Sequence, residues 1–250
     1  MNYETKYEDI GNNYNSTRVA DEYLTNRIFN FLKPISKGIN LDIGCGTGNY
    51  TIALAEKGLN FIGVEPSMKM LDIAKSKSNK IEWKIGYAEK IPVENETFEN
   101  VIATLTIHHW TNLNIAIKEI FRVLKPNGKL VIFTSCPTQM ENYWLNHYFP
   151  VMMQHSILQM PNIHEVAKEL TKESFSIINI EKYFVNNQLK DFFLFSGKER
   201  PEIYFNEKIR NGISSFAALS NKMEVEIGLE KLKIDLESGE FDKIKQNYNE

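Results

Sequence analysis

Cysteine is scarce in this sequence: Cys45 and Cys136 are the only two among 250 residues. Two cysteines this far apart form neither a disulfide framework nor a zinc-binding pattern, so we expect a reducing, cytoplasmic location. An excess of positive charge is also absent, because 29 Lys and Arg stand against 32 Asp and Glu. That balance argues against a nucleic-acid partner, which would require a basic surface. Residues 1–5 lack the basic start and the apolar run of a signal peptide.

One long segment has no charged side chain at all. The 23 residues from Asn142 to His164 contain no Asp, Glu, Lys or Arg. Their number is sufficient to cross a membrane, but Pro150, Pro161 and several Asn, Gln and His side chains interrupt the segment. Because each polar group would cost free energy in lipid, we expect no membrane span. Two interpretations stay open: a lid over an apolar pocket, or helices packed on the core or on a dimer surface.

Strands and helices are predicted to alternate between residues 39 and 135. Short apolar runs predict five strands, over residues 39–43, 61–64, 81–85, 98–104 and 129–134. Amphipathic spacing predicts helices between them, one of them capped by Ser67. This alternation predicts an α/β fold, a Rossmann-like doubly wound, mostly parallel sheet with helical lid elements. A sixth strand is predicted over Ser174–Val185, followed by a helical tail with no final strand after Phe241.

A glycine-rich loop follows the first predicted strand and reads Gly44-Cys-Gly-Thr-Gly48. Such loops bind ligands beyond the carboxyl ends of parallel strands. A dinucleotide site requires a third glycine where this chain has Asn49, and the preceding Asp42 would not favour a pyrophosphate. S-adenosylmethionine has no phosphate and carries an ammonium and a sulfonium, so acidic surroundings suit it. Glu65, at the end of the second predicted strand, can accept hydrogen bonds from two ribose hydroxyls.

Five motifs resemble, in order, those of class I S-adenosylmethionine-dependent methyltransferases: Leu41–Gly48, Gly63–Met70, Gly86–Pro92, Phe98–Trp110 and Arg122–Gly128. From residue 8 to residue 135 the chain is similar to the small-molecule type 11 group, near its trans-aconitate-methyltransferase-like members. The resemblance implies S-adenosylmethionine as cofactor, S-adenosylhomocysteine as product, and in-line methyl transfer to O, N, S or a carboxylate of a small-molecule acceptor. The enzyme would be a monomer or a homodimer. A non-catalytic S-adenosylmethionine-binding protein, acting as a partner or sensor, is the alternative.

The resemblance also implies an organisation and a cofactor site. A helical lid (residues 1–38) precedes the S-adenosylmethionine-binding core (39–135), and a region with a substrate lid, the sixth strand and helices (136–250) completes one domain. The implied cofactor-binding residues are Tyr14, Arg18, Asp42, Gly44, Gly46, Gly48, Glu65, Met70, Ala88, Glu89 and Thr104. Tyr14 and Arg18 belong to a segment that folds over the cofactor in related enzymes, with a surface helix as the alternative. Glu89 is included because Tyr87 stands where the family often has Asp.

Two histidines, His108 and His109, follow the fourth predicted strand, where the resemblance places the methyl group and the acceptor. One of them is predicted to act as a general base or to hydrogen-bond the acceptor, with packing as the alternative. Because positioning alone can supply about 7–11 kcal/mol, a base is optional. The predicted acceptor contacts are Trp110, Tyr143, Trp144 and His147. No metal site is expected, because His147, His155 and His164 lack helical metal-ligand spacing.

Overall fold

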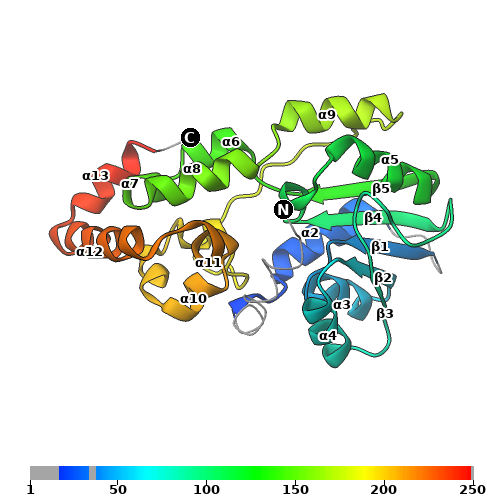
Figure 1. The fold of residues 1–250 in the computed structure, drawn as a ribbon, viewed down its shortest axis with the longest axis horizontal. Helices are drawn as coiled ribbons and strands as arrows, with labels where there is room; N and C mark the ends of the chain where they lie inside the picture. Colours follow the sequence, from blue (N-terminus) through cyan, green and yellow to red (C-terminus); the bar gives the residue numbers. More distant parts are fainter. Residues whose placement is uncertain (1–16, 34–37, 249–250) are drawn as a thin grey trace.

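A computed structural model describes residues 17–33 and 38–248 of the chain. Figure 1 shows an α/β body beside a body made of helices only. The predicted cofactor residue Tyr14 lies outside the described residues.

The sheet of the α/β body has five parallel strands in the order β3-β2-β1-β4-β5. They span Ile39–Ile43 (β1), Asn60–Glu65 (β2), Glu82–Ile85 (β3), Phe98–Thr104 (β4) and Leu124–Phe133 (β5). The five predicted strands are confirmed, although the last begins at Leu124 instead of residue 129. Strand β1 pairs with β2 on one side and β4 on the other. The order in which successive strands are added to the sheet therefore reverses at β1. Such a switch point leaves a crevice at the carboxyl ends of the two strands.

Helices cover both faces of this sheet. They are α2 (Glu22–Leu32), α3 (Asn49–Glu56), α4 (Met68–Lys77), α5 (Leu113–Val123) and α9 (Ile163–Lys172). Alternate residues of β4 mark the two faces: Ile102 packs with side chains of α2 and α3, whereas Val101 and Ala103 pack with those of α5. The Ser67 hydroxyl accepts a hydrogen bond from the Met70 backbone N–H at 3.3 Å, which confirms Ser67 as the N-cap of α4.

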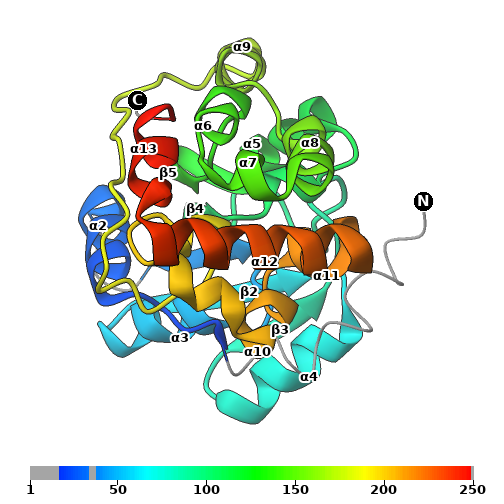
Figure 2. The ribbon, with the colours of Figure 1, turned by 90° about the vertical axis from the view of Figure 1, so that its left-hand side faces the viewer.

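The second body, the helical lobe, has its own apolar core. It contains α6 (Pro137–Glu141), α7 (Leu145–Tyr148), α8 (Pro150–Gln159), α10 (Glu207–Asn211), α11 (Ser214–Leu219), α12 (Lys222–Ser238) and α13 (Glu240–Gln246). Most of the uncharged segment forms α7 and α8, and Trp144, Phe149 and Met152 of this segment are buried. Figure 2 shows α12 lying across the lobe, where its Leu232 joins the same core. These side chains pack between helices, whereas Tyr143, Gln159 and Met160 of the same segment line a large cavity.

The predicted sixth strand is wrong. Residues 174–185 run extended but form no ladder, and within the described chain β5 pairs only with β4. The segment contacts β5 through side chains, such as Tyr183 against Phe133 at 5.3 Å, and makes no backbone ladder with this strand, and both line a large cavity. Apolar side chains of the segment remain exposed as a result, with 79% of the Ile178 surface and 76% of the Phe184 surface accessible.

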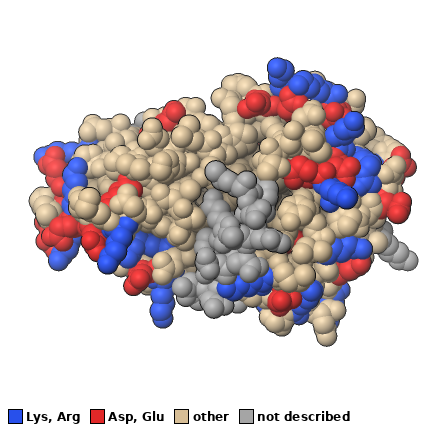
Figure 3. Space-filling model, in the orientation of Figure 1, with Lys and Arg blue, Asp and Glu red and all other residues tan. Residues whose placement is uncertain are grey.

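The visible surface carries both signs of charge. Figure 3 shows acidic and basic side chains interspersed on both bodies, with a sparser distribution over α6 and α8. None of the described helices is long and apolar enough to cross a membrane.

Candidate functional site

Two cavities adjoin at the carboxyl ends of β1 and β4. The smaller, here called the loop cavity, is lined by the glycine-rich loop, the ends of β2 and β4, and residues 86–89. The larger, here called the large cavity, has a volume of about 1340 Å³ and lies between β5, residues 174–185 and the helical lobe. Arg18, Leu105 and His109 line both cavities and therefore mark their junction.

The glycine-rich loop needs its glycines for two different reasons. Gly44, Gly46 and Gly48 have φ angles of 72°, 54° and 76°, which side chains rarely adopt. A Cβ at Gly44 would lie 2.0 Å from the Thr106 hydroxyl, and one at Gly48 would lie 2.4 Å from the Trp83 ring. A Cβ at Gly46 would meet nothing within 4 Å, because this residue faces the loop cavity. The lack of a side chain at Gly44 and Gly48 therefore lets Thr106 and Trp83 pack closely against the loop, whereas at Gly46 it leaves room for a ligand.

Asp42, which lines the loop cavity, has an unsatisfied carboxylate oxygen. Its side chain is buried, and Oδ2 accepts a hydrogen bond from the Thr51 hydroxyl at 2.6 Å. Oδ1 has no hydrogen-bond partner among the described residues. Burial raises the pKa of this carboxyl to about 7, because the ionised form loses its hydration. A buried acceptor without a partner favours a ligand that brings a donor or a positive charge.

Glu65 connects the end of β2 to the glycine-rich loop. Its Oε2 accepts a hydrogen bond from the Gly46 N–H at 3.0 Å, and its Oε1 accepts one from the Ser67 N–H at 3.1 Å. Burial raises the pKa of this carboxyl to about 7, while the two N–H groups oppose that shift. The carboxylate is thus held in the loop cavity, with each of its oxygens hydrogen-bonded to a backbone N–H.

The predicted adenine residues line the same cavity. Met70 and Ala88 are buried there and offer an apolar surface. Glu89 also lines the cavity, but its Oε1 accepts hydrogen bonds from the Thr111 N–H at 2.6 Å and the Asn112 N–H at 3.0 Å. This carboxylate oxygen therefore fixes the chain before α5, which sequence reasoning did not anticipate.

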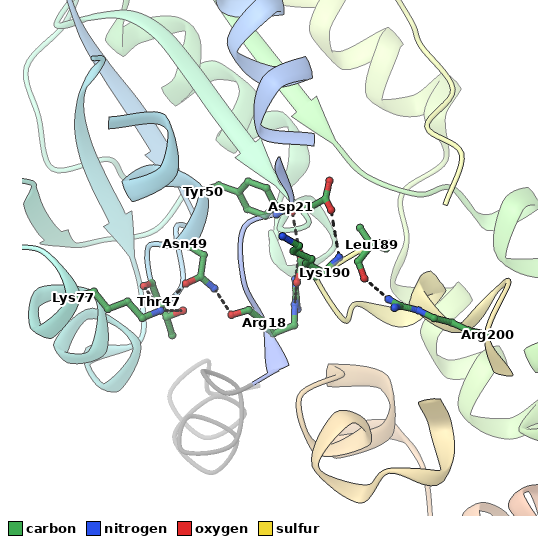
Figure 4. A network of polar contacts seen from close by, with 10 residues as sticks. Arg18, Asp21, Thr47, Asn49, Tyr50, Lys77, Leu189, Lys190 and Arg200 are labelled. Atoms are coloured by element: carbon green, nitrogen blue, oxygen red, sulfur yellow. Dashed lines mark hydrogen bonds and ion pairs between the residues drawn. The ribbon is translucent and has the colours of Figure 1, made fainter. Parts of the chain in front are cut away.

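A polar network connects the loop to helix α4 and to the N-terminal segment (Figure 4). The Lys77 ammonium donates to the Thr47 carbonyl at 3.1 Å and to the Asn49 side-chain oxygen at 2.6 Å. Asn49 in turn donates through Nδ2 to the Arg18 carbonyl at 2.8 Å. Desolvation lowers the pKa of Lys77 to about 8. The network joins α4, the loop and the N-terminal segment, so it fixes where Arg18 lies.

Asp191 is a site residue that sequence reasoning missed. It is 1% exposed, lines the loop cavity, and forms an ion pair with Arg18, 173 positions away. The Tyr50 hydroxyl donates to Asp191 Oδ2 at 3.0 Å. The available signal was an isolated carboxylate within the largely apolar stretch Leu189–Phe195. A buried charge in such a stretch needs a partner, which the fold supplies from the N-terminal segment.

The two predicted catalytic histidines occupy different positions. Both belong to a short 3-10 helix after β4, and their ring centroids are 3.9 Å apart. His109 lines both cavities, whereas His108 lines only the large one. Leu105, which precedes this helix, has a φ of 53°, an uncommon conformation for a non-glycine residue. Thr104 and Trp110 line the loop cavity on either side of this turn.

Aromatic side chains from separate elements form part of the wall of the large cavity. Tyr143 stacks on Phe195 with centroids 4.7 Å apart, and Phe133 meets Phe193 edge to face at 6.0 Å. The other two predicted acceptor contacts in the helical lobe, Trp144 and His147, lie outside the lining of both cavities. Trp144 is buried in the lobe core, where its indole N–H donates to the Lys198 carbonyl at 3.1 Å. His147 packs against Tyr148.

The chemistry of the loop cavity fits S-adenosylmethionine. The unpartnered Asp42 oxygen suits a cationic donor, Glu65 suits a pair of hydroxyls, and the space over Gly46 admits a ligand close to the backbone. In residues 17–33 and 38–248, no group of three or more His, Cys, Asp or Glu side chains is placed to hold a metal ion.

Comparisons with known proteins agree with this geometry. A family model described as a methyltransferase domain matches residues 41–132. A crystal structure of a putative methyltransferase from an antibiotic biosynthesis pathway of Anabaena variabilis is 33% identical, with a TM-score of 0.84. That match covers 92% of this chain and 93% of the other.

Two curated relatives match over shorter regions. A demethylmenaquinone methyltransferase of Oceanobacillus iheyensis is 31% identical over 172 residues, which is 65% of this chain and 70% of that protein. An uncharacterised methyltransferase of Mycobacterium tuberculosis is 35% identical over 100 residues, or 40% of this chain. That match spans 41% of the mycobacterial protein, less than half of its length.

Proposed function

Since this chain belongs to the class I S-adenosylmethionine-dependent methyltransferases, we propose that it transfers a methyl group from S-adenosylmethionine to a small acceptor with an apolar body. The observation that carries the proposal is Asp42, a residue that lines the loop cavity and whose buried Oδ1 has no partner among the described residues. When bound, S-adenosylmethionine supplies a methyl carbon that its sulfonium already activates for displacement. The chain's task is then to bind, orient and exclude water.

The residues of the loop cavity divide that task among them. Asp42 would accept hydrogen bonds from the ammonium side of the donor, directly or through water, and Glu65 would accept them from the ribose hydroxyls. Met70 and Ala88 would pack on the adenine. Holding both reactants in line can supply about 7–11 kcal/mol of the barrier.

The large cavity supports an apolar acceptor. Aromatic side chains are part of its wall. His109 lies at its junction with the loop cavity, where it would hydrogen-bond the acceptor or receive its proton. One relative is named for demethylmenaquinone, an apolar quinone, which is in keeping with such a cavity. The volume of the large cavity, about 1340 Å³, exceeds that of a typical small-molecule pocket, about 300–1,000 Å³.

Calorimetric titration with S-adenosylmethionine and S-adenosylhomocysteine tests the donor. We expect both to bind, and the absence of binding by either would overturn the proposal. A panel of apolar phenols, amines, thiols and carboxylates with radiolabelled donor then identifies the acceptor class. Phe195→Ala should raise the KM of an accepted substrate without changing the Kd of S-adenosylhomocysteine. The matched control is Leu158→Ala, since Leu158 lies in the same lobe, is 77% exposed and lines neither cavity.

A further inference from the structure

The loop cavity carries mostly negative charge. Four carboxylate side chains line it, those of Asp42, Glu65, Glu89 and Asp191. Of the Lys and Arg residues in the described chain, Arg18 is the one that lines this cavity. Arg18 also lines the large cavity, so this residue lies where the two cavities adjoin.

Asp191 holds this guanidinium with both of its oxygens. Arg18 Nε donates to Oδ1, and Nη2 donates to Oδ2 at 3.2 Å. The side chains are only 12% and 1% exposed, so their charges act in a medium less polarisable than water. The hydroxyl of Tyr50 adds a third hydrogen bond to Asp191, at 3.0 Å. Tyr50 of α3 therefore holds the Arg18–Asp191 pair against the α/β body.

The backbone beside the pair is also fixed. The Phe192 N–H donates to the Thr17 carbonyl at 3.3 Å, and the Arg18 carbonyl accepts from Asn49 at 2.8 Å. Arg18 would thus keep its place beside the cavity if Asp191 lost its charge. The Arg18–Asp191 pair would then gain one unit of positive charge, which would act on any ligand in the loop cavity.

We propose that Asp191 neutralises Arg18 and thereby sets the preference of the loop cavity for the cationic donor over the neutral product. The inference rests on the proposed function, since the donor carries a sulfonium where S-adenosylhomocysteine carries an uncharged thioether. Asp191 acts through Arg18 and is a positioning residue. An anchor with only a structural role would change the affinity for both ligands equally, because they differ by one methyl group and its charge.

The test measures the Kd of S-adenosylmethionine and of S-adenosylhomocysteine for the full chain by calorimetry. Asp191→Asn keeps the size and one acceptor oxygen but removes the charge. We expect the ratio of the two Kd values, donor over product, to rise on the order of tenfold, as for one unit charge acting across a cavity. Arg18→Met removes the opposite charge and should lower the same ratio below that of the unchanged protein.

The matched control is Glu181→Gln. Glu181 forms an ion pair with Arg27 of α2, but both side chains are about one-third exposed, at 35% and 32%. Solvent screens this pair, so the ratio should not change. Equal changes for both ligands, or an unchanged ratio in folded Asp191→Asn, would overturn the inference. If Asp191→Asn does not fold, an unchanged or raised ratio in Arg18→Met overturns it. Failure of the unchanged protein to bind either ligand would instead refute the proposed function.

Discussion

The backbone N–H of Gly46 donates a hydrogen bond to Oε2 of Glu65 at 3.0 Å, across the carboxyl ends of β1 and β2. Glu65, the proposed partner of the ribose hydroxyls, therefore also orders the glycine-rich loop. That loop would hold the rest of the donor. Glu65→Gln should weaken S-adenosylhomocysteine binding by about 1.5–3 kcal/mol, the contribution of a hydrogen bond to a charged group. Calorimetry measures this loss. Glu82→Gln on the neighbouring strand is the control, because Glu82 is exposed and forms an ion pair with Lys84. Equal losses in both variants would contradict the assignment.

The pH dependence follows from the two buried carboxyls of the loop cavity. Burial raises the pKa of Asp42 from 3.8 to about 7 and that of Glu65 from 4.5 to about 7. The folded protein therefore holds protons that the unfolded chain has released, and its stability without ligand should fall as pH rises from about 4 to 7 and then level off. Urea unfolding at a series of pH values measures this fall. A stability that rises over the same range would contradict it.

Ligand affinity should depend on pH in the opposite direction. A cationic ligand binds the ionised carboxyls, so binding below pH 7 must release protons. The Kd of S-adenosylmethionine should decrease between pH 6 and 8, by up to about tenfold per pH unit for each proton released. Titrations in buffers with different ionisation enthalpies count these protons directly. A proton count of zero at pH 6 would contradict this prediction.

Asp42→Asn should raise the stability of the ligand-free protein and lower its affinity for S-adenosylmethionine. Asparagine can still accept the hydrogen bond from Thr51, but it removes a buried charge that has one unpaired oxygen. We expect the melting temperature of the ligand-free protein at pH 8 to rise by about 2–4 °C, corresponding to about 1 kcal/mol. The affinity for S-adenosylmethionine should fall at least about tenfold. A variant that loses stability as well would show that Asp42 serves the fold and not the ligand.

Local patterns predicted the part of the fold where local interactions decide structure. The short apolar strands, the Ser67 cap and the glycine-rich loop each have a signature within a few residues, and the structure contains all three. The packing of Trp144 in the lobe core has no such signature. An aromatic side chain suits a pocket wall and a core equally, and only the arrangement of α7, α12 and α13 decides between them.

Long-range contacts escaped prediction for the same physical reason. Asp191 and Arg18 are 173 positions apart, and neither residue's neighbours indicate the other. The left-handed backbone of Leu105 was also unforeseen, since leucine gives no sign of a positive φ. The sequence of Ser174–Val185 predicted a strand, but strand formation depends on backbone pairing with a sheet edge, and in the described chain β5 pairs only with β4.

Two glycines of the loop should respond differently to a single methyl group. Gly46→Ala places its Cβ in open space, so its cost is the left-handed backbone alone, about 1 kcal/mol, while binding of S-adenosylhomocysteine is lost. Gly48→Ala adds a contact of 2.4 Å with Trp83, so it should destabilise the fold by more than that. Urea unfolding and calorimetry on both variants make the comparison. Tight binding by Gly46→Ala would show that the ligand does not approach this backbone.

His108 and His109 lie in one short helix, so a substitution at His108 is a matched control for the same substitution at His109. His109 lines both cavities, whereas its neighbour His108 lines only the large one, so a proton removed at the junction would reach His109. With an acceptor found by the panel, His109→Gln should lower kcat by about 10²–10⁴-fold for a hydroxyl acceptor and much less for a thiol or carboxylate acceptor, which ionises without help. His108→Gln should lower kcat less than His109→Gln for every acceptor. Equal losses for hydroxyl and thiol acceptors would mean that His109 orients the acceptor without taking its proton.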